Sequence, residues 1–597
     1  MSLSIERVIP LTVADPRIVQ MDRTYPVLKG GREVLYKEYT TTNISQSSVT
    51  FSAPPPSMNV YVDRRIHLLL PVRVEIVATN PGAGASPLVA EPHRFAIRSY
   101  PAQKAMDSIQ MTLNNQSMSV NIGDILSAIE LFNIDCELKR VDFSKCPTVG
   151  CWQAQEFSSL YQGNRSPMAL YIDAPTCAPS ASFPFTVAAQ DLSTNVCTTK
   201  VDFVTCEPLF LSPLYWGAFD HDESAFWGLK TMDFTFNFKS NAANRMVAID
   251  PVATDAWTST AITTMNASFS NFSSPAFSYA ETQPKLLLQY LTPQLADRQV
   301  SHDKVLNYPY FNIEQYVTDL PAIAAGATTN ASTSSVQLNS IPSRLYVFAR
   351  KRNQDLLALP GAGEPTIGPF ATDTFLKISS VSLQWGNRSG VLSSANMRQI
   401  YDLAVKAGCQ LSWAEWSGEK LVNSTAGADG SGFGYAANQY AGCGSVMCIE
   451  PLDVGLDSLD APGKNDHLMI QLTLGLQNVS AASITPAIYV VAVSQGLFSI
   501  YNGQASSMIG VLSSQDILDS HAQAANKMIS YSDVQDMYGG RMRGNFFGKL
   551  KAGLLGALKA GVPLAKACAP CALEIGKAVA GAGPMSKKEL KDRLKRI

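Results

Sequence analysis

Five local patterns occur in this chain and then occur again in the same order. They are a strand after an arginine, a strand followed by an Asn-containing turn and a helix, a Glu-Pro-Leu step, an alternating strand and a proline-led apolar strand. The first set begins at Arg65, Ser108, Glu207, Met232 and Pro284, and the second at Arg344, Ser380, Glu450, Ile470 and Pro486. This matched order predicts two copies of one β-rich domain, which is more typical of a building block than of an enzyme.

The length and composition agree with a two-domain subunit that is covered by neighbours. The chain has 597 residues, too many for a single hydrophobic core. Only 16% of the residues are charged while 46% are hydrophobic, so much of the surface is expected to lie against other molecules. The first residues lack the apolar core of a signal peptide, and the 11 scattered cysteines are expected to be reduced in a protein assembled inside a cell.

Alternation of apolar and polar residues dominates both copies. Val72 and Val74 are separated by a polar residue in the first copy, as are Leu472 and Leu474 in the second. Such period-two patterning places one face of a strand on a core and the other toward solvent or a partner. Short strands separated by loops rich in Gly, Pro, Asn and Ser predict an all-β sandwich or barrel.

Two helix patterns stand at matched places, each after a strand. We expect helices over residues 124–133 and 394–407, each with its apolar residues on one face. Ser394 is the expected N-cap of the second helix, and Gly408 is expected to follow its end.

The first copy is longer than the second because of two segments, about residues 135–200 and 240–283. The second copy has its own Gly- and Ala-rich segment at 423–445. Insertions of this size are tolerated in surface loops, so we expect these segments to form an exposed crown.

Three segments resemble the double jelly-roll major capsid proteins of double-stranded DNA viruses. Within that lineage, the chain is most similar to the virophage, polinton and polinton-like virus group. The three segments are residues 29–33, the strand-turn-helix around Ser108, and residues 288–293. The resemblance spans about residues 25–512 and rests on the order and spacing of several weak motifs. It implies tandem jelly-roll β-sandwiches with short flanking helices and no enzymatic activity.

The resemblance also implies an assembly. The expected unit is a homotrimeric capsomer of pseudo-hexagonal outline in the icosahedral shell of a virion, contacting neighbouring capsomers, penton and minor capsid proteins. The expected division is an N-terminal arm (1–24), a first jelly roll with long loops (25–295), a second jelly roll (296–512), a linker (513–540) and a basic amphipathic C-terminal tail (541–597).

A short motif follows the second copy. Met537, Gly539, Gly540 and Arg541 form the pattern Met-X-Gly-Gly-X, which resembles the sites that adenovirus-type cysteine proteases cut after the second glycine. Two glycines fit an extended, narrow groove because they carry no Cβ. We predict cleavage after Gly540 by a viral maturation protease; the alternative is a flexible Gly-Gly hinge.

The residues after this motif differ in charge from the rest of the chain. Residues 541–597 hold 13 Lys or Arg and 3 Asp or Glu, a net charge of +10 in a chain whose total is −2. An apolar helical face is predicted there from Phe547, Leu550, Leu554 and Leu558. Basic amphipathic segments bind anionic membranes or nucleic acid, so the genome and an internal membrane are candidate partners. The alternative is a tail that only docks on the inner floor of the capsomer.

Other motifs predict no catalytic residue, cofactor or metal ligand. Cys568 and Cys571 form a lone Cys-X-X-Cys, and the acidic residues Asp453, Asp457, Asp460 and Asp466 miss the spacing of a calcium loop. Two rival interpretations stay open at this point. One is a carbohydrate-binding β-sandwich protein, and the other is a membrane-active effector that acts through its tail.

Overall fold

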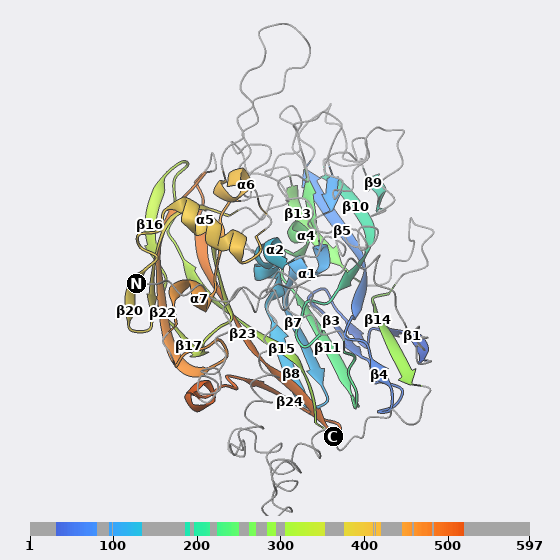
Figure 1. Cartoon of the computed structure of the whole chain (residues 1–597). Helices are drawn as coiled ribbons and strands as arrows, with labels where there is room; N and C mark the ends of the chain where they lie inside the picture. The colour runs from blue at the N-terminus through green and yellow to red at the C-terminus, as the bar shows by residue number, and fades with distance from the viewer. Residues whose placement is uncertain are drawn as a thin grey trace, which may run out of the picture.

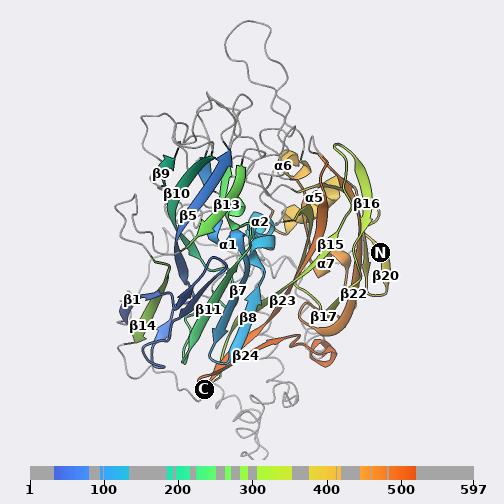
Figure 2. The same ribbon diagram turned by 180° about the vertical axis from the view of Figure 1, so that it is seen from behind.

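The computed structural model describes residues 32–79, 95–97, 100–133, 185–191, 196–214, 224–249, 262–269, 283–293, 305–352, 375–409, 411, 413–418, 444–456, 459–479 and 483–518. These residues form two antiparallel β-sandwiches that stand side by side (Figure 1; Figure 2). The predicted boundary at 295/296 lies outside the described residues, between the last strand of one sandwich and the first strand of the other.

The first sandwich is built from two sheets, A1 and B1. Sheet A1 has the order β1 (Arg32–Thr40), β14 (Lys285–Pro293), β5 (His67–Thr79), β10 (Val196–Pro208) and β9 (Phe185–Asp191), with β4 (Tyr61–Val62) beside β14 and β13 (Ile262–Ser268) beside β5. Sheet B1 has the order β2 (Asn43–Ile44), β3 (Ser48–Ser52), β11 (Met232–Phe238), β7 (Met106–Leu113) and β8 (Gln116–Val120). Strands β6 (Phe95–Ile97) and β12 (Val247–Ile249) pair separately.

The second sandwich repeats this plan in sheets A2 and B2. Sheet A2 has the order β15 (Leu306–Asp319), β23 (Pro486–Tyr501), β18 (Arg344–Lys351) and β21 (Val446–Ile449), with β24 (Gln504–Ile509) beside β23. Sheet B2 has the order β16 (Thr328–Ser332), β22 (Asn465–Gln477), β19 (Lys377–Trp385) and β20 (Arg388–Val391), with β17 (Val336–Ser340) also on β22.

The two strand orders correspond position by position. The series β1-β14-β5-β10 matches β15-β23-β18-β21, and β3-β11-β7-β8 matches β16-β22-β19-β20, with β17 continuing β16 along β22. Sheet neighbours that are distant in sequence are what a jelly roll requires. The duplicated patterns fall on matched strands: Ser108 and Ser380 lie in β7 and β19, Pro284 directly precedes β14, and Pro486 begins β23. The prediction of tandem jelly rolls is therefore confirmed.

Short helices flank the sandwiches. They are α1 (Pro101–Ala105), α2 (Ile122–Asn133), α4 (Ala242–Met246), α5 (Met397–Lys406), α6 (Trp413–Ser417) and α7 (Pro451–Val454). Helices α2 and α5 follow the matched strands β8 and β20, as expected.

The predicted N-cap of α5 is wrong. The cap is Asn396, not Ser394, because the Asn396 side chain accepts a hydrogen bond from the Gln399 N–H at 2.9 Å. The Asn396 N–H donates in turn to the Gln399 side chain, also at 2.9 Å. This reciprocal pair satisfies two N–H groups at the helix start, and the helix begins one residue later.

The prediction that the two long insertions are loops is wrong in part. Strand β9 extends sheet A1 beyond β10, and β13 pairs with residues 73–78 of β5. Strand β14 pairs with β5 only at His67, Leu68 and Leu69, so β13 continues along the edge that β14 leaves. A long apolar strand such as β5 would otherwise expose unpaired backbone groups. The rest of both insertions, and residues 423–443 of the third predicted loop, lie outside the described residues.

The hydrophobic cores of the two jelly rolls are continuous. Buried apolar side chains of both sandwiches belong to one cluster. Strand β23 is buried from Pro486 to Ile500, on both of its faces, whereas its counterpart β14 alternates between buried and half-buried residues. Sheet A2 is therefore covered on its outer face, and what covers it is the first jelly roll.

Candidate functional site

The candidate functional site is the junction between the jelly rolls, where β8 of sheet B1 and α2 meet β24 and β18 of sheet A2 (Figure 1). Aromatic rings join the two sides: Phe132 packs edge-on against Tyr346 with ring centroids 5.2 Å apart. Phe226 packs in the same way against Tyr308 at 5.0 Å and Phe498 at 5.9 Å. Edge-to-face aromatic pairs contribute about 0.5–1.5 kcal/mol each beyond the area they bury.

Backbone groups of both jelly rolls are also satisfied across the junction. The Trp227 N–H donates to Tyr308 Oη at 2.9 Å, and that hydroxyl donates to the Ala225 carbonyl at 3.2 Å. The Phe311 N–H donates to Ser212 Oγ at 2.8 Å. These bonds fix the register of β15 against the loops that precede β11.

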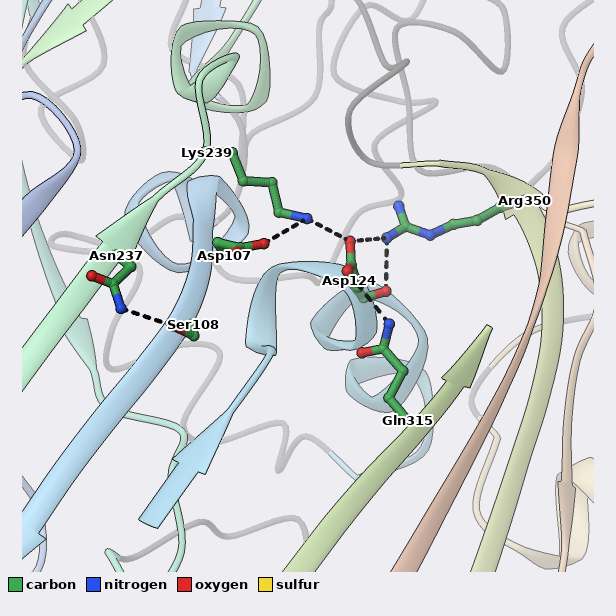
Figure 3. A network of polar contacts seen from close by, with 7 residues as sticks. All are labelled: Asp107, Ser108, Asp124, Asn237, Lys239, Gln315 and Arg350. Carbon is green, nitrogen blue, oxygen red and sulfur yellow. Dashed lines mark hydrogen bonds and ion pairs between the residues drawn. The ribbon is translucent and has the colours of Figure 1, made fainter. Parts of the chain in front are cut away.

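A polar network centred on Asp124 ties α2 to β15, to β18 and to the residue that follows β11 (Figure 3). Lys239 Nζ, just after β11, lies 2.9 Å from Asp124 Oδ1. Arg350 Nη2, from β18, donates to the Asp124 carbonyl at 2.7 Å and lies 4.0 Å from its Oδ1. Gln315 Nε2, from β15, donates to Asp124 Oδ2 at 3.4 Å. One carboxylate therefore joins cationic and amide groups from both jelly rolls.

The charge balance of this network is set by burial. The Arg350 side chain is 1% exposed and that of Asp124 is 16% exposed. Burial pushes the pKa of Asp124 up, but the ammonium of Lys239 and the guanidinium of Arg350 outweigh it and hold the pKa below its usual value. Asp124 therefore stays ionised, and it balances the charge of Arg350, which also lies 5.5 Å from the centre of the Tyr489 ring.

The end of α5 approaches the end of α2 at this junction. Gly408 has a φ of +103°, and a Cβ at this residue would lie 2.8 Å from the Phe132 carbonyl oxygen. The glycine predicted to follow α5 is confirmed, and it has a second role in allowing two backbones to come together.

The site residues predicted from sequence lie elsewhere. The cleavage motif of Met537, Gly539, Gly540 and Arg541, and the tail face of Phe547, Leu550, Leu554 and Leu558, are outside the described residues. Asp453 accepts from the Glu450 N–H at 3.1 Å. Asp460 and Asp466 both pair with Lys464. In the described segments, no three His, Cys, Asp or Glu side chains gather as metal ligands, and no helix is long and apolar enough to cross a membrane.

Sequence reasoning missed the Asp124 network. Its members are far apart along the chain, with 226 positions between Asp124 and Arg350. The available signal was a basic residue near the end of a strand that is otherwise apolar, since Arg350 closes the run Leu345–Ala349. A charge in that position requires a partner if the strand is buried on both faces.

Two matched jelly rolls in one chain, packed against each other at the junction, define a double jelly-roll protein. Residues 7–291 match the family described as the Sputnik virophage major capsid protein first domain. Residues 313–496 match the family described as the major capsid protein V20 C-terminal domain. The chain belongs to the major capsid proteins of virophages, and its place is in the capsid of the virion.

Individual relatives agree with this family. The chain is 27% identical to the putative capsid protein V20 of Sputnik virophage over 554 residues, which cover 91% of this chain and 87% of that protein. It resembles a chain of the Sputnik virophage cryo-EM structure with a TM-score of 0.72 and 25% identity, covering 89% of this chain and 99% of that one. The mavirus major capsid protein crystal structure matches with a TM-score of 0.61 and 15% identity, over 87% and 98% of the two chains.

Proposed function

We propose that this major capsid protein assembles as a homotrimer, a capsomer in which six jelly rolls form a pseudo-hexagonal ring. The observation that carries the proposal is the junction itself, which joins unlike surfaces, sheet B1 with sheet A2. Head-to-tail contacts of this kind generate rings when the rotation between units closes. Three chains of two similar jelly rolls each make a ring of six. Such rings tile an icosahedral shell, in contact with neighbouring capsomers and with penton and minor capsid proteins.

Size-exclusion chromatography with light scattering tests this proposal. The purified chain is expected to have three times its monomer mass of 64.4 kDa over a wide range of concentrations. Electron micrographs of the same sample are expected to show particles with a near-hexagonal outline. A monodisperse monomer at all concentrations contradicts the trimer. The two rival interpretations, a carbohydrate-binding sandwich and an effector acting through its tail, gain no support from the described part of the chain.

We also propose that a viral cysteine protease removes the tail after Gly540 during maturation. The support is the Met-X-Gly-Gly-X pattern at a boundary of charge, with a net +10 after it in a chain whose total is −2. The described second jelly roll is complete by β24, so cutting at Gly540 leaves both sandwiches intact. Intact-mass spectrometry of purified particles is expected to find a subunit ending at Gly540. A mature subunit that still runs to Ile597 contradicts the cleavage.

Before cleavage, the tail is proposed to face the interior and to bind phosphate groups of the genome or of an internal membrane. Its basic charge and the apolar face of Phe547, Leu550, Leu554 and Leu558 support this location. A peptide of residues 541–597 is expected to bind vesicles rich in anionic lipid, or DNA, with an affinity that falls as salt rises. A variant with Leu550, Leu554 and Leu558 changed to Ser separates the two partners, because it should lose lipid binding and keep DNA binding. A peptide that binds neither contradicts the proposal.

A further inference from the structure

The sheets of the chain follow one another in a row, A1, B1, A2, B2, which ends in sheet A1 on one side and in sheet B2 with α5 on the other (Figure 1; Figure 2). Each of these end surfaces has a counterpart inside the junction. We propose that α5 and sheet B2 of one chain dock on the outer face of sheet A1 of a second copy, in the geometry of the internal junction. This inference rests on the proposed trimer and assigns the surfaces that close it.

The two matched helices differ in burial as this docking requires. Helix α2 is buried around its whole circumference, at residues Ile122, Ile125, Leu126, Ala128, Ile129, Leu131 and Phe132. Helix α5 buries only Ile400 and Ala404, while Arg398, Gln399 and Asp402 are exposed and Val405 is 44% exposed. A helix that is apolar all round packs on two sides, and an amphipathic helix packs on one. Helix α5 therefore lacks, within its own chain, the neighbouring jelly roll that α2 has.

The two matched sheets differ in the same way. Pro284 and Pro486 stand at the start of the matched strands β14 and β23, so Leu287 and Leu291 correspond to Tyr489 and Val493. Tyr489 and Val493 are buried at 2% and 0% exposure, whereas Leu287 and Leu291 are half-buried in the single chain. The outer face of sheet A1 thus carries large apolar side chains. The matching positions of sheet A2 are covered by the first jelly roll.

Strand register identifies a residue at the centre of the proposed contact. Tyr36 of β1 is paired with Gln289, and Gln315 of β15 is paired with Val491. Gln289 and Val491 are each the fifth residue after the matched proline, so Tyr36 corresponds to Gln315. Gln315 is the β15 residue that bonds to α2, and Tyr36 is 76% exposed.

The matching partner of Tyr36 on α5 follows from helix position. Asp124, the α2 residue that Gln315 contacts, is the third residue of its helix, and the third residue of α5 is Gln399. Tyr36 of one copy should therefore lie beside Gln399 of the next, where a phenol and an amide can exchange a hydrogen bond. Tyrosine and half-buried leucines with a polar fringe are typical of subunit contacts.

Paired cysteines test this contact in the full-length chain. In Tyr36→Cys/Gln399→Cys, mild oxidation or a short bismaleimide linker is expected to give covalent dimers and trimers on a non-reducing gel. Because a closed ring has only three such contacts, the ladder should stop at the trimer. Both side chains are exposed, and Gln399→Cys removes only the bond from the Asn396 N–H while the Asn396 side chain still caps α5, so both jelly rolls should stay folded. Wild type and the two single variants show the background from native cysteines.

Met469 of β22 supplies a matched control. It is 48% exposed, but its register counterpart, Thr231 just before β11, stays exposed beside the internal junction. Tyr36→Cys/Met469→Cys is therefore expected to give only background. As a second readout, Tyr36→Arg should raise the concentration at which the trimer dissociates by about tenfold or more, and Met469→Arg by less than about twofold.

The outcomes separate this inference from the trimer proposal. If the Tyr36/Gln399 pair gives only background while light scattering shows a trimer, the surface assignment is wrong and the trimer stands. If the ladder continues past the trimer, the contact is right but the ring is not closed. If the wild-type chain is a monomer throughout, the inference falls together with the trimer.

Discussion

Replacing Asp124 by Asn tests whether the polar network holds the two jelly rolls together. The change keeps the shape of the side chain and removes its charge. Arg350, which is 1% exposed, would then keep its hydrogen bond to the Asp124 carbonyl at 2.7 Å and its place 5.5 Å from the centre of the Tyr489 ring, but lose the carboxylate. Lys239, 13% exposed, would lose its ion pair at 2.9 Å.

The expected loss follows from these contacts. Leaving one partner of a buried ion pair without the other costs about 3–5 kcal/mol. Here the carbonyl and the aromatic ring remain for Arg350, and its distance to Asp124 Oδ1 is 4.0 Å, so the lower part of that range applies. We expect Asp124→Asn to lower the free energy of unfolding by about 2–3 kcal/mol.

Chemical denaturation followed by tryptophan fluorescence measures this loss, since the buried Trp227 lies at the junction. Asp107→Asn is the matched control, because Asp107 lies 3.5 Å from the same Lys239 Nζ but is 64% exposed. That variant should lose less than about 0.5 kcal/mol. Equal losses in both variants, or a loss under about 0.5 kcal/mol for Asp124→Asn, would refute the reasoning.

The pH dependence of this effect has a definite sign. The pKa of Asp124 is lowered in the folded chain, so its contribution is present above the unfolded pKa of about 3.9 and is lost as the pH falls through the folded pKa. The difference in the free energy of unfolding between wild type and Asp124→Asn should therefore have its full size at pH 6 and become smaller in acid.

Three further predictions follow from buried groups. Burial raises the pKa of Glu207 to about 7, so the contribution of Glu207 to stability falls as the pH rises from its unfolded pKa of about 4.3 to 7. The melting temperature of Glu207→Gln should therefore equal that of wild type near pH 5 and be higher than that of wild type at pH 8. Gly408→Ala should cost about 1–3 kcal/mol in urea denaturation, because its Cβ would lie 2.8 Å from the Phe132 carbonyl oxygen and its φ is +103°. Phe132→Ala should cost about 3–5 kcal/mol in the same assay, since this ring is 1% exposed and packs on Tyr346.

The strand plan could be predicted because it depends on local patterns. Apolar residues at every second position, such as Val72 and Val74, indicate which face of a strand is buried, and the same alternating pattern occurs in the second copy. Proline before β14 and at the start of β23 marked matched strands for the same local reason.

The junction could not be predicted because its partners are brought together by the fold. Even a repeated tripeptide changed its role between the copies. Glu207 is fully buried and accepts hydrogen bonds from backbone N–H groups of α1, at 2.7 Å from Ala102. Glu450, in the matched step, lies at the start of α7 and 3.3 Å from Arg344. The same tripeptide, Glu-Pro-Leu, therefore takes part in two different local structures.

The continuous core has a consequence for the mechanics of the shell. Because buried side chains run without a break from one jelly roll to the other, turning one against the other would expose apolar surface and break the Asp124 network. The two jelly rolls are therefore expected to move as one rigid body, without a hinge between them. A closed shell needs curvature, and a rigid pair of jelly rolls cannot supply it by bending. The bending of a shell built from this chain must then occur at the contacts between chains.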